Sequence, residues 1–314
     1  MFKHEKEQKI YEIEGVKLGG QPGQLPTVMM GSIFYEGQKI LNNAKKGEFN
    51  KEKAQELIKT EEELSDQTGN PMLLDICCAW PQAFEKLIDF VASNTDSPFA
   101  IDGTTAEVKI AGANYVKETG LSSRAVYNSI MPQAKDNELI AIKESGIESA
   151  ILLTLNTKNP TLAGRIEMMD ELQSLAHKAG IVKPLIDTTV IDKPDVGPIS
   201  KAIFMVKEQY GIPAGAGVHN AIARWGEMSE LSSEKFILAN AVAHSFPIAM
   251  GADFLLYGPI ENAPEAYFVS SLADTYVAYN ARQEFRIRPL TNNHPLMRIF
   301  RKNNNRKEIN NKLN

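Results

Sequence analysis

Residues 99–128, FAIDGTTAEVKIAGANYVKETGLSSRAVYN, contain the pattern that decides the fold. A short apolar run ends at Asp102, an amphipathic segment follows it, and a second apolar run ends at Asn128. One strand, one helix and their connections take roughly 30 residues in a βαβ unit. The stretch therefore predicts a strand, a helix and the next parallel strand.

The same pattern continues on both sides. Apolar runs end at an Asp or Asn six times in succession, at intervals of 27, 26, 28, 31 and 33 residues. The six residues are Asp75, Asp102, Asn128, Asn156, Asp187 and Asn220. Together with the apolar runs TVMMGSIF (27–34) and ADFLLYG (252–258), they give eight predicted strands and eight predicted helices. We predict a (β/α)8 TIM barrel over residues 26–288.

An open, doubly wound sheet is the alternative fold. It would be expected to carry a Gly-rich phosphate turn after a strand, and the sequence has neither such a turn nor a composition break between two halves. The segment 51–68 shows the pattern of an amphipathic helix. It follows a candidate N-cap at Asn50, ends before Gly69, and places five residues on one stripe: Ala54, Leu57, Ile58, Glu61 and Leu64.

Two terminal segments fall outside the predicted barrel. Residues 1–25 include IYEIEGVKLGG, whose alternation around Glu14-Gly15 predicts a hairpin that closes the bottom of the barrel. Residues 289–314 end in RKNNNRKEINNKLN, which is polar and Asn-rich, so we predict a lightly packed C-terminal tail.

Composition excludes several classes of protein. Hydrophobic residues make up 43% of the chain, charged residues 23%, and the net charge is −5, which argues against disorder and against nucleic acid as a partner. The only cysteines, Cys77 and Cys78, are adjacent, so neither a disulfide framework nor a CxxC metal site is expected. A cytoplasmic location is expected instead. No run approaches the ~18 apolar residues of a spanning helix, so membrane insertion is not expected.

The residues at the predicted strand ends carry the chemistry. In a TIM barrel the C-terminal ends of the strands meet at one mouth. A carboxylate only accepts hydrogen bonds and matches two adjacent donors, such as the N3–H and 2-amino groups of a pterin, whereas an Asn amide both donates and accepts. Only His219 among the five histidines stands near a predicted strand end, so no metal site is predicted.

Simpler structural roles are possible for each residue alone. Asp102 and Asp187 could cap helices, and Asn128 and Asn220 could form Asx turns. For Asp75 a turn or cap is the favoured interpretation, whereas Asn156 is predicted to line the pocket. His219 is interpreted as structural, and Cys77 and Cys78 as buried packing residues.

At these residues the sequence resembles a known family, the pterin-dependent methyltransferases related to the H subunit of tetrahydromethanopterin S-methyltransferase. Five segments carry the resemblance: GGQPGQLPTVMMGSIFY (19–35), AIDGTTAEVKIAGANY (100–115), YNSI (127–130), LIDTTV (185–190) and GVHNA (217–221). It looks closest to stand-alone bacterial members that pass a methyl group from a corrinoid protein to tetrahydrofolate during glycine betaine use. Dihydropteroate synthases share the Asp, Asn and Asp set on a related barrel.

The resemblance implies roles for four residues around a bound pterin. Asp187 would pair with N3–H and the 2-amino group, Asn128 with the N1 side, and Asp102 with the N8–H region. Asn220 would lie against N5, the atom that gains or loses the methyl group. Asn220 and Asp102 are therefore the expected catalytic residues, and Asn156 is added to the pterin-binding set by its interval.

The resemblance also implies partners. The chain lacks the D-x-H-x-x-G stretch by which many corrinoid proteins supply a histidine to cobalt, so methylcobalamin would be carried by a separate corrinoid protein that docks over the barrel mouth. A homodimer is the expected assembly. Two alternatives remain: a dihydropteroate synthase-like enzyme, which would need Lys or Arg to hold a pyrophosphate, and a non-catalytic subunit of a tetrahydromethanopterin methyltransferase complex.

Overall fold

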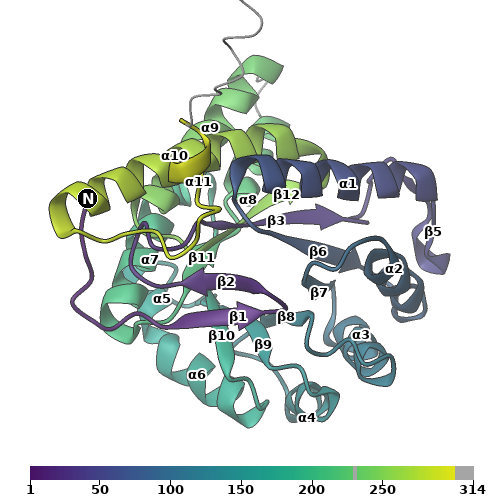
Figure 1. The fold of residues 1–314 in the computed structure, drawn as a ribbon. Coiled ribbons are helices and arrows are strands. Elements are labelled where there is room, and N and C mark those ends of the chain that lie inside the picture. Colours follow the sequence, from purple (N-terminus) through teal and green to yellow (C-terminus); the bar gives the residue numbers. More distant parts are fainter. Residues whose placement is uncertain (229–231, 301–314) are drawn as a thin grey trace, which may run out of the picture.

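The computed structural model, which describes residues 1–228 and 232–300, contains a closed barrel of parallel strands (Figure 1). Each strand pairs with the next one along the chain, and the last pairs with the first. The barrel strands are β3 (Val28–Ile33), β6 (Met72–Cys78), β7 (Phe99–Gly103), β8 (Ala125–Ile130), β9 (Ser149–Leu153), β10 (Lys183–Asp187), β11 (Ala214–Ala216) and β12 (Phe254–Pro259). The predicted TIM barrel is confirmed.

Helices surround the barrel (Figure 1). They are α1 (Lys51–Thr68), α2 (Pro81–Asn94), α3 (Ala106–Glu118), α4 (Asp136–Ser145), α5 (Leu162–Glu167), α6 (Met169–Lys178), α7 (Val196–Tyr210), α8 (His219–Met228), α9 (Ser233–Ala249), α10 (Ala263–Phe285) and α11 (Pro295–Arg298). The sequence predicted one helix between β9 and β10, but α5 and α6 occupy this position. It also missed α8, which precedes the predicted α9. Among the described residues, none of the helices has the length and apolar character needed to cross a membrane.

Short elements fill the connections between these helices and strands. The turn helices are η1 (Ala44–Lys46), η2 (Lys193–Asp195) and η3 (Ile260–Asn262). An antiparallel pair, β4 (Leu41–Asn43) and β5 (Glu48–Phe49), lies between β3 and α1, and a second pair, β1 (Ile10–Ile13) and β2 (Val16–Gly19), forms the N-terminal hairpin. The hairpin turns at Glu14 and Gly15, which both have positive φ, as a tight two-residue turn requires.

The barrel interior is apolar at its N-terminal end. One side chain from nearly every strand forms a buried layer: Val28, Met30, Leu73, Ala100, Val126, Ile151, Leu185 and Phe254. Ile13 and Leu18 of the hairpin pack against this layer and cover it. The N-terminal end of the barrel is therefore closed by apolar packing, and any ligand site inside the barrel must lie toward the C-terminal mouth.

Alternation along the strands puts polar residues above this apolar layer. Side chains two positions apart on a strand point to the same face, so the next inward residues after Leu73, Ala100, Val126 and Leu185 are polar. They are Asp75, Asp102, Asn128 and Asp187. The fold itself therefore brings these residues to the C-terminal half of the barrel interior.

The C-terminal segment packs more closely than its composition suggests. His294 and Pro295 at the start of α11 are buried, and the Leu290 backbone N–H donates to the Gln24 carbonyl oxygen. Between residues 289 and 298 the segment is therefore docked at a few points, whereas its other side chains are intermediate or exposed. Residues 301–314 of the predicted tail lie outside the described residues.

The helix α1 carries a buried acid. Its boundaries match the prediction, with Asn50 Oδ1 accepting from the Lys53 backbone N–H at 3.0 Å and Gly69 in the left-handed conformation. Glu61 is fully buried and accepts a hydrogen bond from the Tyr267 hydroxyl at 3.2 Å. Burial raises the pKa of Glu61 to about 8, while the bond from Tyr267 acts in the opposite direction.

Replacing Glu61 by Gln should stabilise the protein in a pH-dependent way. Between the ordinary pKa of 4.5 and about 8, the folded state keeps a proton that the unfolded state has lost, so wild-type stability falls as the pH rises through this window. Gln does not titrate, so Glu61→Gln should raise the free energy of unfolding by about 3 kcal/mol at pH 7 and by little at pH 4.5. Urea denaturation at both pH values measures this. Glu56→Gln, on the exposed side of the same helix, is the control, and equal effects of the two variants would contradict the assignment.

Candidate functional site

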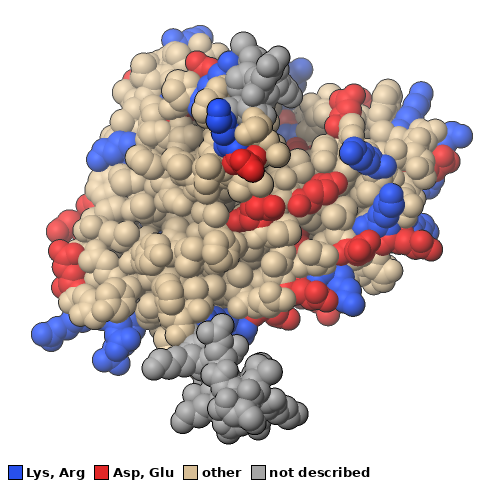
Figure 2. Space-filling view, turned by 90° about the horizontal axis from the view of Figure 1, so that it is seen from above, with Lys and Arg blue, Asp and Glu red and all other residues tan. Residues whose placement is uncertain are grey.

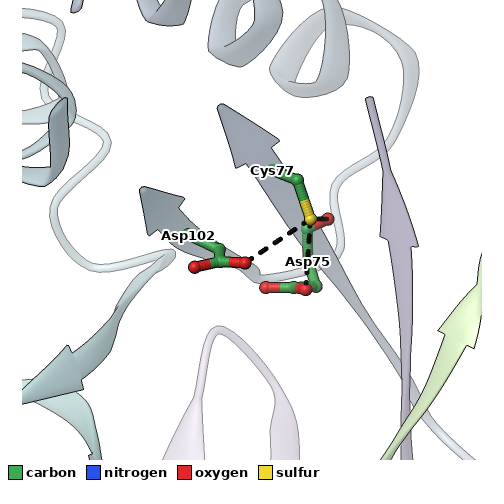
Figure 3. Close-up of side chains that lie close together, drawn as sticks. All are labelled: Asp75, Cys77 and Asp102. Carbon is green, nitrogen blue, oxygen red and sulfur yellow. Dashed lines mark hydrogen bonds between the residues drawn. The ribbon is translucent and has the colours of Figure 1, made fainter. Parts of the chain in front are cut away.

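The first group of polar residues at the mouth comes from β6, β7 and β8. In the strand register Cys77 lies opposite Asp102, and Asp102 lies opposite Asn128. The Cys77 thiol lies 3.5 Å from Asp75 Oδ2 and 3.5 Å from Asp102 Oδ2, so it bridges the two carboxylates (Figure 3). Asn128 Nδ2 donates to Asp75 Oδ1 at 3.0 Å. The four side chains therefore form one connected cluster.

Burial and like charge control protonation in this cluster. The pKa of Asp102 is raised, chiefly by burial and then by the negative charge of Asp75. Burial also raises the pKa of Asp75 and, to well above its usual range, that of the Cys77 thiol. The thiol therefore stays protonated and can donate its one proton to either of the two carboxylates beside it.

A buried ion pair supports the strand that carries Asn128. Lys109 Nζ donates to the Ser129 carbonyl oxygen at 2.6 Å and lies 3.0 Å from Glu138 Oε1. The Tyr127 hydroxyl donates to the same Glu138 oxygen at 2.7 Å. The backbone after Asn128 and the side chain of Tyr127 before it are thus both held, which restricts where the strand places Asn128.

The second group lies at the ends of β10 and β11. Asp187 is the last residue of β10 and is 6% exposed, and its Oδ1 accepts from the Thr189 backbone N–H at 2.7 Å. A Cβ built on Gly217 would lie 3.4 Å from Asn220 Nδ2 and 3.9 Å from Asp187 Oδ2. Asn220 and Asp187 are therefore neighbours on either side of a glycine whose missing side chain leaves room at the mouth.

The surroundings of Asp187 change the pKa of its carboxyl. Burial raises its pKa to about 6, whereas the backbone N–H groups of Thr189 and Gly217 and the charge of Arg165 act in the opposite direction. Arg165 is itself buried and donates to the Thr188 carbonyl oxygen at 2.9 Å and to Asp195 Oδ2 at 2.6 Å. Arg165 thus holds the backbone that follows Asp187, so it affects both the position of the carboxylate and its pKa.

Asn156 does not join either group. It follows β9 by three residues, and its amide is used within its own loop: Oδ1 accepts from the backbone N–H groups of Lys158 and Asn159, and Nδ2 donates to the Gly164 carbonyl oxygen. The prediction that Asn156 lines the pocket is corrected, because an amide whose oxygen and nitrogen both stabilise a loop is not presented to a ligand.

Two further differences concern Asp75 and Asn220. Asp75 was interpreted as a cap or turn, but β6 continues to Cys78 and Asp75 points into the barrel. Cys77 is likewise a member of the cluster rather than a packing residue. Asn220 lies at the second position of α8 rather than at a strand end, and its side chain is exposed.

His219, next to Asn220, contributes to a separate cavity. A cavity of about 700 Å³ lies between α8, α9 and the start of α10, and its walls include His219, Phe236, Asn240, His244 and Glu261. Gly258 faces the His219 ring so closely that a Cβ there would come within 2.2 Å of Cγ. His219 therefore points toward this outer cavity, and not toward Asp102 or Asp187 at the barrel mouth.

One group of residues has the spacing of a cation site. Within the described residues, Asp75, Cys77 and Asp102 form the one such group, with ligand atoms within 4.8 Å of one another. Ser32 Oγ, Asn128 Nδ2 and the Cys77 thiol already direct hydrogen bonds at Asp75, so this carboxylate is satisfied by its protein neighbours, whereas Asp102 has, in the described part of the chain, only the shared thiol beside it. The mouth is therefore better suited to a neutral, flat ligand with N–H donors than to an ion.

Known structures with this fold include pterin enzymes. The chain is similar to the 7,8-dihydropteroate synthase of Vibrio fischeri, with a TM-score of 0.61 and 11% identity, over 85% of this chain and 98% of that one. It is also similar to the dihydropteroate synthase of Xanthomonas albilineans in complex with 7,8-dihydropteroate, with a TM-score of 0.56 and 17% identity, over 88% and 98% of the two chains. At these identities the similarity shows the fold alone.

Sequence relatives and a family model give the closer relationship. The chain is 38% identical to the H subunit of tetrahydromethanopterin S-methyltransferase from Methanothermobacter thermautotrophicus, over 96% of this chain and 100% of the relative. It is 38% identical to the protein of the same name from Methanopyrus kandleri, over 92% and 97% of the two. Residues 6–290 match the family described as the tetrahydromethanopterin S-methyltransferase MtrH subunit. The chain therefore belongs to this family of methyltransferase subunits.

Proposed function

We propose that the protein transfers a methyl group between N5 of a reduced pterin and the cobalt of a corrinoid carried by a partner protein. The observation that carries the proposal is the set of polar residues at the barrel mouth: the inward residues Asp102, Asn128 and Asp187 from the strands, and Asn220 of α8 beside Asp187. Membership of a methyltransferase family and the likeness in fold to a pterin-bound synthase support it.

The polar edge of the pterin accounts for three of these residues. Asp187, as an ionised carboxylate, accepts from N3–H and from one N–H of the 2-amino group. Asn128 faces the N1 side, and Asp102 accepts from N8–H. Because burial raises the pKa of both carboxylates, a ligand that donates N–H groups to them favours their ionised forms and is itself held in one orientation.

Asn220 is proposed to act at N5. When N5 attacks the methyl group, the new C–N bond forms as the carbon–cobalt bond breaks, and the electron pair of that bond stays on the corrinoid. The proton of N5 is then released, and in the reverse direction N5 must be protonated before it leaves. An Asn side chain can donate to the N5 lone pair or accept from N5–H, so Asn220 can follow both states and keep N5 in line with the methyl group.

The identity of the pterin is a separate proposal. The resemblance to stand-alone bacterial members implies tetrahydrofolate, whereas the relatives from Methanothermobacter and Methanopyrus are named for tetrahydromethanopterin. Both pterins present the same 2-amino-4-oxo edge, so the proposed contacts of Asp187, Asn128 and Asp102 serve either one.

A spectroscopic assay tests the function. The purified chain is mixed with methylcobalamin and either tetrahydrofolate or tetrahydromethanopterin, and the absorbance of Co(I) is followed. We expect Co(I) to form with at least one of the two pterins. Failure with both pterins, using methylcobalamin and then a methylated corrinoid protein, would contradict the proposal and favour the non-catalytic subunit. Formation of dihydropteroate from a pterin pyrophosphate would instead indicate the synthase.

Binding should depend on pH through Asp187. A protonated carboxyl cannot accept from both N–H groups, so affinity should begin to fall near pH 7, where Asp102 gains a proton, and should fall more steeply below the free-protein pKa of Asp187, about 6. Fluorescence titration with a pterin between pH 5 and pH 8 measures the dependence. An affinity that rises as the pH falls would contradict the role of Asp187.

We also propose that the protein forms a homodimer, as the resemblance implies. Leu238, Val242 and Phe246 recur every four residues on α9 and are more than half exposed, as are Phe268 and Tyr276 on α10. Figure 2 shows the side of the molecule on which α10 and α1 lie, and a broad area to the left of its centre carries few charged side chains. A second copy could cover such a surface. Light scattering of the purified chain tests this, and a monomer at micromolar concentration would contradict it.

A further inference from the structure

Asp75 occupies a position that the proposed function does not yet use. It is 2% exposed, and it lies one step deeper in the barrel than Cys77, which stands opposite Asp102 in the register. Its carboxylate receives Ser32 Oγ at 2.8 Å and Cys77 Sγ at 3.5 Å on Oδ2, and Asn128 Nδ2 at 3.0 Å on Oδ1. The last contact reaches from β6 to β8 across the strand that carries Asp102.

The contact with Asn128 determines how that amide is oriented. A carboxylate oxygen accepts hydrogen bonds, so it is the NH2 group of Asn128, and not its oxygen, that faces Asp75. One N–H of the amide is then used by Asp75. The amide oxygen and the second N–H remain, and they form an edge with one acceptor and one donor in a fixed order.

This order matches one edge of a pterin. N1 is an acceptor, and the adjacent 2-amino group has a second N–H to donate beyond the one that Asp187 accepts. An Asn128 amide held as described can donate to N1 and accept from the amino group. If the Asn128 amide were rotated by 180°, its oxygen would face the acceptor N1 and its N–H would face an N–H of the 2-amino group. Both contacts would then be repulsive.

We propose that Asp75 is a positioning residue that fixes the order of donor and acceptor on Asn128 and thereby sets the specificity for the N1 and 2-amino edge of the pterin. The inference rests on the proposed function, because it requires a pterin at this mouth. Asp75 acts through Asn128, and Cys77 lies between it and the ligand. The Lys109 contact with the Ser129 carbonyl oxygen holds the backbone, so that the remaining freedom of Asn128 is the rotation that Asp75 controls.

A double-mutant cycle tests this assignment. The dissociation constant of a reduced pterin is measured for the wild type, Asp75→Asn, Asn128→Ala and the double variant. An amide at position 75 can face either end of Asn128, so Asp75→Asn should weaken binding by about tenfold. Because Asp75 acts through Asn128, the double variant should bind as Asn128→Ala does. Multiplied losses in the double variant would overturn the inference.

Two further variants sharpen the result. Ser32→Ala removes another hydrogen bond to the same carboxylate and leaves the Asn128 contact in place, so it should change affinity by less than about threefold. The cycle is repeated with Asp75→Ser in place of Asp75→Asn. The test then still applies if one of the two variants does not fold. Absence of pterin binding by the wild type would overturn the proposed function and this inference together. Multiplied losses on a wild type that binds would overturn the inference alone.

Discussion

Replacing Asp187 by Asn is expected to raise the dissociation constant of a reduced pterin by about 100- to 1,000-fold. The carboxylate is buried and is proposed to accept two N–H groups of the ligand, and hydrogen bonds to a charged group are worth more than neutral ones. An amide at this position keeps the bond from the Thr189 backbone N–H through its oxygen, so the fold is retained. Its NH2 group would face the ligand N–H groups and repel them. Isothermal titration calorimetry measures the effect.

A matched control uses the same change on the same loop. Asp192 is exposed, five residues after Asp187, and accepts from the Lys193 backbone N–H. Asp192→Asn should leave pterin binding within about twofold of the wild type, since the Asp192 side chain is exposed and its charge is screened by water. Similar losses for the two variants would mean that the loop, and not the Asp187 carboxylate, binds the ligand. Asp187→Asn should also remove the steeper fall of affinity below pH 6 and leave only the dependence that Asp102 causes near pH 7.

Replacing Asn220 by Ala is expected to slow methyl transfer by about 100-fold, as the removal of one donor aligned with a reacting atom does, and to weaken pterin binding by less than about threefold. The difference arises because Asn220 is proposed to contact N5, whose bonding changes during the reaction, whereas the pterin is held by the residues at its other edge. Ala is favourable in a helix, so α8 should be retained. Single-turnover formation of Co(I) gives the rate, and calorimetry gives the affinity.

The control for this variant is Asn240→Ala. Asn240 lies in the wall of the neighbouring cavity, and its amide donates to the Phe236 carbonyl oxygen within α9. Both the rate and the affinity should stay near those of the wild type. Equal losses of rate and affinity in Asn220→Ala would refute a role for Asn220 in the chemical step.

The barrel and much of its polar ring could be predicted because their signals are local and periodic. A repeat of about 30 residues specifies the strand order. An apolar run that ends in Asp or Asn identifies a strand with a polar inward position, as at Asp102, Asn128 and Asp187. These residues follow apolar inward residues by two positions, and this spacing is set by the strand itself.

The remaining errors concern places where tertiary contacts override the pattern. The run MLLD suggested that a strand ends at Asp75, but MLLDICC alternates, and Leu73, Asp75 and Cys77 share its inward face. This alternation was the signal that could have identified Asp75 and Cys77. Asn156 fits the interval but lies beyond its strand, where the nearby backbone of its loop uses its amide. Asn220 lies near the other residues although it is not on a strand. The helix α8 begins shortly after the short strand β11, and its first turn places Asn220 beside Gly217.

Binding of a minimal pterin tests the central claim most directly. The purified full chain is titrated in a calorimeter with 6-methyltetrahydropterin, which has the 2-amino-4-oxo edge and N5 but no side chain. Saturable binding by the wild type that is lost in Asp187→Asn and retained in Asp192→Asn is the predicted result. A pterin site at this mouth would be contradicted if the fragment, tetrahydrofolate and tetrahydromethanopterin all failed to bind, or if Asp187→Asn bound them as tightly as the wild type.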